Sequence, residues 1–270
     1  MRIDLLNVVS GLALAVAICY AAYLFRALSI SGAVAAAVVG GIIFGFGGIA
    51  FAVPLLFFFL SSSLLSKTEN INKRNSQKIS ARPGPRTAAQ VFANGGPALI
   101  FVIAYAVNNN PIWFIGYLSA LCESSADTWA TEIGTLSKTP PYSLITWRPK
   151  EAGESGAITF LGTLAALTGS LTTMGIAYLA AIFFGVIPHY DFPVWASVVF
   201  AGFIGALIDS LLGGTLQARF NCQVCQKTVE DRVHCGKPSA KTRGLDFIDN
   251  DMVNFISSLL AAILGLWLVI

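Results

Sequence analysis

The sequence predicts an all-α protein: a polytopic bundle of transmembrane helices with about eight spans. Of its 270 residues, 55% are hydrophobic and only 11% are charged, whereas a soluble domain usually carries about a quarter charged residues. The apolar residues form runs of roughly 17–25 residues, the length that crosses a hydrocarbon layer about 30 Å thick. Strands of a membrane barrel would alternate apolar and polar residues instead. We therefore expect a single integral-membrane domain that covers residues 1–270.

The first three spans follow one another closely. Asp4 interrupts the basic N-terminal region and the apolar run that follows is longer than that of a secretory signal, so we interpret this run as a transmembrane helix. The second and third runs are separated by a glycine-rich segment, 45–48, which we expect to form a tight turn. Pro54 in the third run is acceptable because neighbouring membrane helices can satisfy the backbone. The expected spans are Leu5–Phe25, Ser31–Phe46, Gly48–Leu65, Ala88–Val107, Ile112–Ala130, Ile158–Phe184, Val194–Leu212 and Met252–Ile270.

Lysine and arginine residues predict the orientation of the bundle. With eight spans, all of these residues except Arg2 fall in connections on one side, while the loops on the other side contain none. The positive-inside rule makes the basic side cytoplasmic. We therefore expect a multi-pass protein of a prokaryotic plasma membrane with both termini outside. The larger cytoplasmic loops are residues 66–87, 131–157 and 213–251.

The cytoplasmic end of the fifth span is the first candidate metal site. Ionisable residues in a membrane span are costly and need a reason. Glu123 and Asp127 are one helical turn apart on the same face. The hydroxyls of Ser124, Thr128 and Thr131 lie nearby in the sequence. Oxygen ligands of this kind suit Mg²⁺ or another hard cation. The alternative interpretation is a cluster of helix-end carboxylates solvated by headgroup water.

Asp209 in the seventh span is the second candidate. Gly202, Gly205 and Gly213 share its helical face at spacings of three and four, which lets another helix approach closely. An acid in the middle of such a face needs a cation or hydrogen-bond donors. The alternative is a tight packing seam with one buried, hydrogen-bonded acid.

Further polar and basic residues are candidate ligands around these acids. Asp251 at the start of the last span is explained as a helix cap that complements the dipole, and it is also a candidate magnesium ligand. Asn254 lies about one turn further in. Gln90 and Asn94 are four residues apart and share a helical face. The glycine-containing turn 151–159 precedes a long helix, where a phosphate can bind. The candidate phosphate-binding cations are Lys67, Arg82, Arg86 and Lys138.

Three cysteines and a histidine in loop 213–251 form a candidate zinc site. Cys222 and Cys225 have the Cys-x2-Cys spacing, and His234 and Cys235 follow as neighbours. Three thiolates and one imidazole can hold a structural zinc ion. However, adjacent histidine and cysteine residues rarely both turn toward one metal without strain, and a second Cys-x2-Cys pair is missing. Reduced free thiols fit a cytoplasmic loop equally well, so both interpretations stay open.

Five segments together resemble the integral-membrane family catalogued as unknown-function domain ninety-two. That family includes animal transmembrane protein nineteen and the phytyl-phosphate kinases of plants and cyanobacteria. The resemblance covers nearly the whole chain in the expected order. One departure concerns residues 153–157, Gly-Glu-Ser-Gly-Ala, where related sequences often carry a Gly-Thr-Asn-Gly-Gly-like segment. The matching segments are 61–67 (SSSLLSK), 90–96 (QVFANGG), 126–134 (ADTWATEIG), 209–213 (DSLLG) with Gln217, and 250–254 (NDMVN).

The resemblance implies a kinase that transfers a nucleotide phosphate, from CTP or another triphosphate, to a membrane-embedded isoprenyl monophosphate. Asp127, Asp209 and Glu132 would hold Mg²⁺ and form the catalytic set, while the cations above, Gln90, Asn94 and Asn254 would bind substrate. The segments around the two aspartates also look similar to those of membrane cytidylyltransferases and dolichol-kinase-like enzymes. A lipid cytidylyltransferase or isoprenol kinase, and a membrane transporter, are the alternatives. The expected partners are lipid, isoprenyl phosphate and nucleotide; no nucleic acid is expected, and a homo-oligomer is left open.

Overall fold

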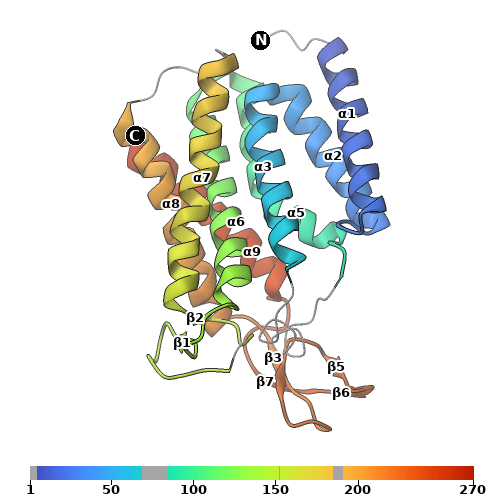
Figure 1. Cartoon of the computed structure of the whole chain (residues 1–270), viewed down its shortest axis with the longest axis vertical. Helices are drawn as coiled ribbons and strands as arrows, with labels where there is room; N and C mark the ends of the chain where they lie inside the picture. The colour runs from blue at the N-terminus through green and yellow to red at the C-terminus, as the bar shows by residue number, and fades with distance from the viewer. Residues whose placement is uncertain (1–4, 69–83, 152, 185–190) are drawn as a thin grey trace.

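The computed structural model describes residues 5–68, 84–151, 153–184 and 191–270, with side chains from Val9 onward. Within these residues, eight long helices lie side by side and carry short strands at one end (Figure 1). The first turn of α1 lies at the opposite end. The helices are α1 (Leu5–Leu24), α2 (Ile30–Gly47), α3 (Ile49–Ser66), α5 (Ala88–Asn108), α6 (Ile112–Gly134), α7 (Phe160–Phe184), α8 (Phe192–Thr215) and α9 (Asn250–Val269).

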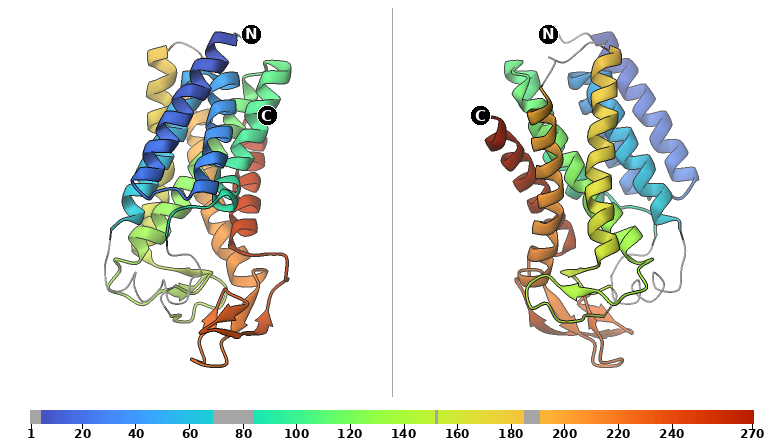
Figure 2. Two further views of the ribbon diagram at one scale, coloured as in Figure 1. Left: turned by 90° about the vertical axis from the view of Figure 1, so that its right-hand side faces the viewer. Right: turned by 60° about the vertical axis from the view of Figure 1, so that its left-hand side comes forward.

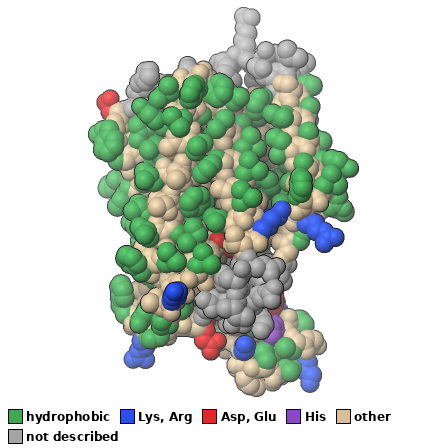
Figure 3. All heavy atoms as spheres, in the orientation of Figure 1, with side chains coloured by type: hydrophobic (Ala, Val, Ile, Leu, Met, Phe, Trp, Pro, Cys, Tyr) green, Lys and Arg blue, Asp and Glu red, His purple; other side chains and the backbone are tan. Residues whose placement is uncertain are grey.

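Most of these helices have the length and composition of membrane spans. Among the described residues, six qualify, namely α2, α3, α5, α7, α8 and α9, and α1 adds a shorter apolar stretch, Val9–Leu24. Helix α6 has 23 residues, long enough to cross a bilayer, but it carries Glu123, Asp127 and Glu132 and is less apolar. Apolar side chains cover the helical part of the face in Figure 3, and the lysines and arginines seen there lie toward the strand-bearing end. The expected class, a helical membrane bundle, is confirmed.

Several helix boundaries differ from the expected spans by up to four residues. Helix α6 continues four residues beyond its expected end, to Gly134, and so includes Glu132. The break between α2 and α3 needs only Gly48, whose φ of 71° is a conformation that glycine adopts without steric cost. The expected four-residue glycine turn was therefore too long. Helix α7 begins at Phe160 because Ala157–Ile158 form strand β2 instead.

Helix α6 lies at the centre of the bundle and contacts α3, α5, α7, α8 and α9. Its first half is buried on all sides, with Tyr117 and Leu121 fully inaccessible. The glycine face of α8 packs on this helix: a Cβ atom at Gly202 would lie 2.5 Å from the Cβ of Cys122, and one at Gly205 would lie 2.5 Å from the Cγ of Glu123. The small residues thus allow two helices to approach closely.

The long loop before α9 folds locally into small sheets at the strand-bearing end (Figure 2). Strand β3 pairs antiparallel with both β4 and β7, and β5 pairs antiparallel with β6. Arg243 in β7 donates hydrogen bonds to the carbonyl oxygens of Gly213 and Gly214, which ties this unit to the end of α8. The strands are β1 (Tyr142–Ser143), paired with β2 (Ala157–Ile158), β3 (Arg219–Asn221), β4 (Thr228–Val229), β5 (Val233–His234), β6 (Lys237–Pro238) and β7 (Ala240–Arg243).

Candidate functional site

A polar cavity of about 1030 Å³ lies at the strand-bearing end of the bundle, bordered by α3, α5, α6, α7, α8 and α9 and by the loop that joins α6 to α7. It gathers most of the predicted site residues from distant parts of the chain. Arg82 lies outside the described residues, and Asp251 sits in the first turn of α9, away from the cavity lining. The predicted residues that line the cavity are Lys67, Arg86, Gln90, Asn94, Asp127, Glu132, Lys138, Asp209 and Asn254.

Two buried carboxyl groups meet at one serine at the inner end of this site. Ser257 Oγ lies 2.7 Å from Glu123 Oε1 and 3.0 Å from Asp209 Oδ2, and both acids are buried, Glu123 with 1% and Asp209 with 9% of its surface exposed. A hydroxyl carries one proton and can donate to only one carboxylate at a time. The second carboxyl group therefore relies on another donor, on a proton of its own or on a cation; at Glu123 the Ser124 hydroxyl lies 3.3 Å from Oε2.

Asp127 and Asn254 complete the acidic end of the cavity. The charge of Asp127 acts on both Glu123 and Asp209, so carboxylates from α6 and α8 share one space. The Asn254 side chain satisfies its hydrogen bonds when its amide nitrogen faces Asp209. The nitrogen then donates to Asp209 Oδ2 at 3.1 Å and to the Asn250 carbonyl at 2.9 Å. Oxygen atoms of the kind that a hard cation could bind therefore converge here.

Arg86, Gln90 and Asn94 form a polar ridge on the α5 side of the cavity. The chain before α5 runs beside the turn between α1 and α2, where the backbone N–H of Arg86 donates to the Ala27 carbonyl at 3.0 Å. Gln90 accepts a hydrogen bond from the Thr87 N–H (2.9 Å), and Asn94 donates to the Gln90 carbonyl (2.9 Å). Burial lowers the pKa of the Arg86 guanidinium and the charge of Glu132 opposes this change; an arginine nevertheless stays protonated.

Two of the predicted residues have local partners as well. Ser66, the last residue of α3, donates a hydrogen bond to Glu132 Oε1 at 2.6 Å, which joins the ends of α3 and α6 at the rim of the cavity. Lys67 Nζ lies 5.7 Å from the ring centre of Phe25, within range of a cation–π contact. Lys138 is exposed, so its ammonium group is accessible to an anion in the cavity.

The glycine-containing loop before α7 also borders the cavity, through residues 153–159. Its additional acid, Glu154, forms an ion pair of 2.9 Å with Lys150, so it does not bring an unbalanced negative charge. Gly156 has a φ of 75°, and a Cβ there would lie 2.5 Å from the Cα of Gly214. Only glycine allows this loop to lie against the end of α8.

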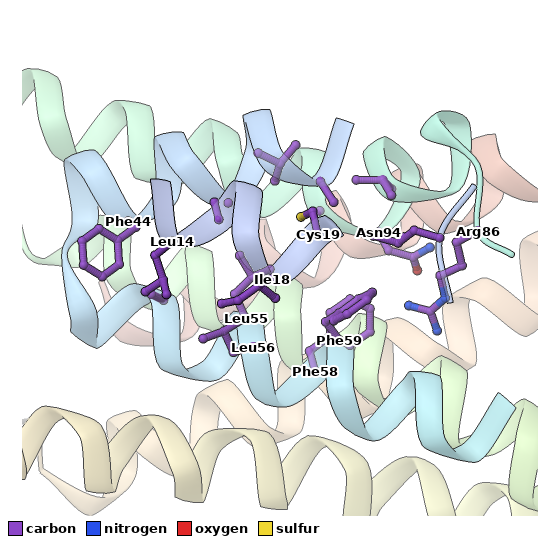
Figure 4. A pocket seen from close by; sticks show the side chains of 18 of the residues that line it. Leu14, Ile18, Cys19, Phe44, Leu55, Leu56, Phe58, Phe59, Arg86 and Asn94 are labelled. Atoms are coloured by element: carbon purple, nitrogen blue, oxygen red, sulfur yellow. The ribbon is translucent and has the colours of Figure 1, made fainter. Parts of the chain in front are cut away.

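A second, apolar groove adjoins the polar cavity. It is bordered by α1, α2, α3 and the start of α5, and its lining is almost entirely aliphatic or aromatic. Figure 4 shows Phe44 at one end of the groove and Arg86 and Asn94 at the other. Arg86, Gln90 and Asn94 line both the groove and the polar cavity. The polar ridge is therefore the boundary between an apolar space and a charged one.

Sequence reasoning missed two residues that hold the site together. Ser257 lies in an apolar span, and its only signal is its position three residues after Asn254, on the same helical face. Glu230 stands beside Asp231 in the cysteine loop, and nothing in the sequence distinguishes it from the other acids of the loop. Its Oε1 accepts hydrogen bonds from Ser155 (2.8 Å) and Gln217 (3.0 Å), and it lines the cavity wall.

The cysteine loop gathers its four candidate ligands at a place separate from the cavity lining. Hydrogen bonding from the backbone N–H of Cys225 lowers the pKa of the Cys222 thiol to about 6. Desolvation and the neighbouring thiols of Cys225 and Cys222 raise the pKa of Cys235 to about 11. The four side chains therefore act on one another electrostatically.

Comparison with known proteins places the chain in a family. It is 32% identical to Protein PGR of Arabidopsis thaliana over 92% of this chain and 91% of that protein. It is 30% identical to an uncharacterised membrane protein of Methanocaldococcus jannaschii, over 72% of this chain and 76% of the relative. The chloroplastic Protein VTE6 of Arabidopsis thaliana is 25% identical over 90% of this chain and 66% of its own length. No solved structure matches the chain. Residues 13–262 match the family described as Integral membrane protein DUF92, and the chain belongs to this family of integral membrane proteins.

Proposed function

We propose that the protein is an isoprenyl-phosphate kinase. An oxygen of the isoprenyl monophosphate attacks the γ-phosphorus of a nucleoside triphosphate, the bond to the β-phosphate oxygen breaks, and isoprenyl diphosphate and nucleoside diphosphate are released. The acceptor is already an anion, so the reaction depends on positioning and charge compensation rather than on a protein nucleophile. The motif resemblance to phytyl-phosphate kinases supports this class of reaction.

The observation that carries the proposal is the sharing of Arg86, Gln90 and Asn94 by the apolar groove and the polar cavity. An isoprenyl phosphate has an apolar tail that suits the groove and a charged head that suits the cavity. At the boundary, the Arg86 guanidinium can form paired, charge-assisted hydrogen bonds with phosphate oxygens. Gln90 and Asn94 supply neutral groups beside it that orient the headgroup.

The acidic end of the cavity suits a magnesium ion. Asp127 and Asp209 offer carboxylate oxygens at the cavity wall, with Glu123 buried behind them, and a bound cation would offset the repulsion between the two carboxyl groups at Ser257. When bound, Mg²⁺ supplies positive charge beside the phosphate oxygens of the nucleotide. Asn254 holds the Asp209 carboxylate in place, and Lys138 and Lys150 are cations that can attract the nucleotide into the cavity.

Orientation in the membrane follows from the same proposal. Nucleoside triphosphates are soluble and present on the cytoplasmic side, so the strand-bearing end should face the cytoplasm. This agrees with the positive-inside rule, since the basic connections occupy that end. A prokaryotic plasma membrane is the proposed location, and cysteine labelling at exposed Thr228 and at exposed Asp191 would test the orientation from the two sides.

The decisive test is a kinase assay with the purified chain, Mg²⁺, phytyl or geranylgeranyl monophosphate and each nucleoside triphosphate in turn. We expect isoprenyl diphosphate by mass spectrometry, and a loss of about 10²–10³-fold for Asp209→Asn, the usual range for removing a group that stabilises transition-state charge. Asp191→Asn, at the other end of the same helix, is the matched control and should keep full activity. An inactive wild-type chain, or a fully active Asp209→Asn variant, would rule out the proposal.

The same assay separates the two other enzyme classes. A lipid cytidylyltransferase would leave CMP joined to the lipid and release diphosphate, which labelled CTP reveals at once. An isoprenol kinase would accept the free alcohol and produce a monophosphate. Either product, found in place of the diphosphate, would assign the site to that chemistry and reject phosphorylation of an isoprenyl monophosphate.

A further inference from the structure

The loop between α8 and α9 brings a soft-ligand cluster together from two separate hairpins. The ligand atoms of Cys222, Cys225, His234 and Cys235 all lie within 4.8 Å of one another. His234 Nδ1 is 3.3 Å from Cys235 Sγ and 3.6 Å from Cys225 Sγ. With zinc–sulfur bonds of about 2.3 Å and zinc–nitrogen bonds of about 2.0 Å, a tetrahedral site has nitrogen–sulfur edges of about 3.5 Å and sulfur–sulfur edges of about 3.8 Å. The two nitrogen–sulfur distances already match such edges, and the other ligand atoms lie within 4.8 Å, close enough to converge on one ion.

The backbone explains how adjacent His234 and Cys235 face the same point. Cys235 has a φ of 52° and Gly236 a φ of 73°, and these two residues form the turn between β5 and β6. Positive φ at both central residues is the hairpin turn of type I′. The side chain of Cys235 is thereby directed back toward the histidine that precedes it. The objection that neighbouring ligands cannot converge therefore does not hold for this turn.

The first hairpin presents its two cysteines by a related device. Gln226, the residue after Cys225, has a φ of 59°. Its N–H donates to the Cys222 carbonyl at 2.9 Å, and the Cys222 N–H donates to the Lys227 carbonyl, also at 2.9 Å. Non-glycine residues adopt positive φ infrequently. Both hairpins therefore hold a residue in this conformation beside a ligand, and such local strain persists only where the surroundings stabilise it.

Polar contacts tie the loop to the end of α8, but its own interior is small. Its own apolar core consists of Ala218, Phe220, Cys222 and Val229, which is too small to hold a unit of this size without a cross-link. The described cysteines are all free thiols. A metal ion at the four-residue cluster would join the β3–β4 hairpin to the β5–β6 hairpin and supply the missing stability.

We propose that Cys222, Cys225, His234 and Cys235 bind one structural Zn²⁺ ion, and that this ion fixes the cavity wall that contains Glu230. Four protein ligands leave no open coordination position, which is typical of a structural rather than a catalytic zinc ion. Three thiolate sulfurs and one imidazole nitrogen favour zinc over magnesium or calcium. Glu230 lies between the two ligand pairs in the sequence, and its carboxylate contacts Ser155, Gln217 and Arg219 at the cavity.

Metal analysis of the full-length protein tests the site without any activity assay. Protein purified in detergent without chelators should contain about one zinc atom per chain by plasma mass spectrometry. Cys225→Ser and His234→Asn should lose most of this zinc, whereas Cys19→Ser, in α1, should retain it. Iron in place of zinc, or wild-type protein that contains no metal and takes up none from added Zn²⁺, would overturn the proposal.

Two measurements on the wild-type chain cover the case in which the variants do not fold. Replacement of zinc by Co²⁺ should give the visible absorption bands of tetrahedral thiolate coordination. Zinc should also protect the loop thiols from alkylation until a chelator is added. To test the role of the ion, limited proteolysis after chelation should cleave within residues 219–243. A loop that resists protease equally well with and without zinc would contradict the proposed fixing of the wall.

Discussion

Small residues have different effects on the two sides of the bundle: close packing of helices on one side and an open groove on the other. Around α6, α8 and α9, glycines let helices approach until Glu123 and Asp209 share the hydroxyl of Ser257. Around α1, α2 and α3, small residues such as Gly40 and Ala36 leave an apolar groove open. The first side concentrates hard oxygen ligands at one end of the bundle, and the second offers space for a hydrocarbon tail.

Because the two sides differ in this way, the boundary between them carries the most information about the substrate. Neither a buried acid cluster nor an apolar groove alone indicates a particular substrate. Their meeting at Arg86, Gln90 and Asn94 is the observation on which the proposed amphipathic substrate with an anionic head rests. Changes made on each side, and at the boundary, should therefore affect different properties of the protein.

The largest expected effect is on the closely packed side. Gly205→Leu adds a side chain whose Cβ alone would lie 2.5 Å from the Cγ of Glu123 and 2.7 Å from the Cβ of Ala261. Overpacking of this kind costs about 3 kcal/mol at the upper end of its usual range. We expect a clear fall in the apparent Tm in detergent. Gly175→Leu is the control, since no atom lies within 4 Å of a Cβ there, and equal Tm values for the two variants would refute the close approach.

The next effect is at the boundary. Arg86→Gln removes a charged donor that we assign to the lipid phosphate, and a hydrogen bond to a charged group is worth about 1.5–3 kcal/mol. Steady-state kinetics should show kcat/KM for the isoprenyl phosphate lower by about 10- to 100-fold, with little change in the KM of the nucleotide. Arg148→Gln, an exposed arginine outside the cavity lining, should behave as the wild type. A larger change in the KM of the nucleotide would instead show that Arg86 binds the nucleotide.

The groove is tested by filling it. Ala36 lines the groove, whereas Val34 on the same helix is 63% exposed. Ala36→Phe should lower kcat/KM for geranylgeranyl phosphate by about tenfold, because the displaced tail loses apolar contact worth roughly 1–2 kcal/mol. Val34→Phe should not. A short substrate such as dimethylallyl phosphate should be affected much less, and equal losses for both chain lengths would show that the tail lies elsewhere.

The smallest effect is expected at the rim. Ser66→Ala removes the hydrogen bond to Glu132, and a single hydrogen bond at a partly hydrated site contributes about 0.5–1.5 kcal/mol. The rate should fall by about threefold in the kinase assay, because the ends of α3 and α6 are less well joined. Ser197→Ala, which loses only its bond to the Pro193 carbonyl at the other end of α8, is the control. A hundredfold loss for Ser66→Ala would instead give the serine a direct role with substrate.

The turn at Cys235 and Gly236 shows that the sequence separation of two ligands does not by itself decide whether they can share a metal. Adjacent His234 and Cys235 argue against a shared metal when only their sequence separation is considered. The positive φ of Cys235 and Gly236 changes this geometry, and a turn type of that kind depends on how β5 pairs with β6. Gly236 is the one hint in the sequence, since glycine favours such turns.

The sequence by itself determined the helical spans and the acids within them. Hydropathy and run length locate the helices because a bilayer imposes one thickness on every span, and the cost of burying Asp127 and Asp209 marks them as exceptional. The glycine face of α8 follows from helical spacing alone, since residues three and four apart share a face.

Only the tertiary structure decided which residues meet. Ser257 joins Glu123 to Asp209, Glu230 reaches the cavity from the cysteine loop, and Arg86 faces two spaces at once. These contacts link segments that are far apart along the chain. They depend on the rotation and tilt of each helix, which packing against neighbouring helices sets and which no local pattern of residues encodes.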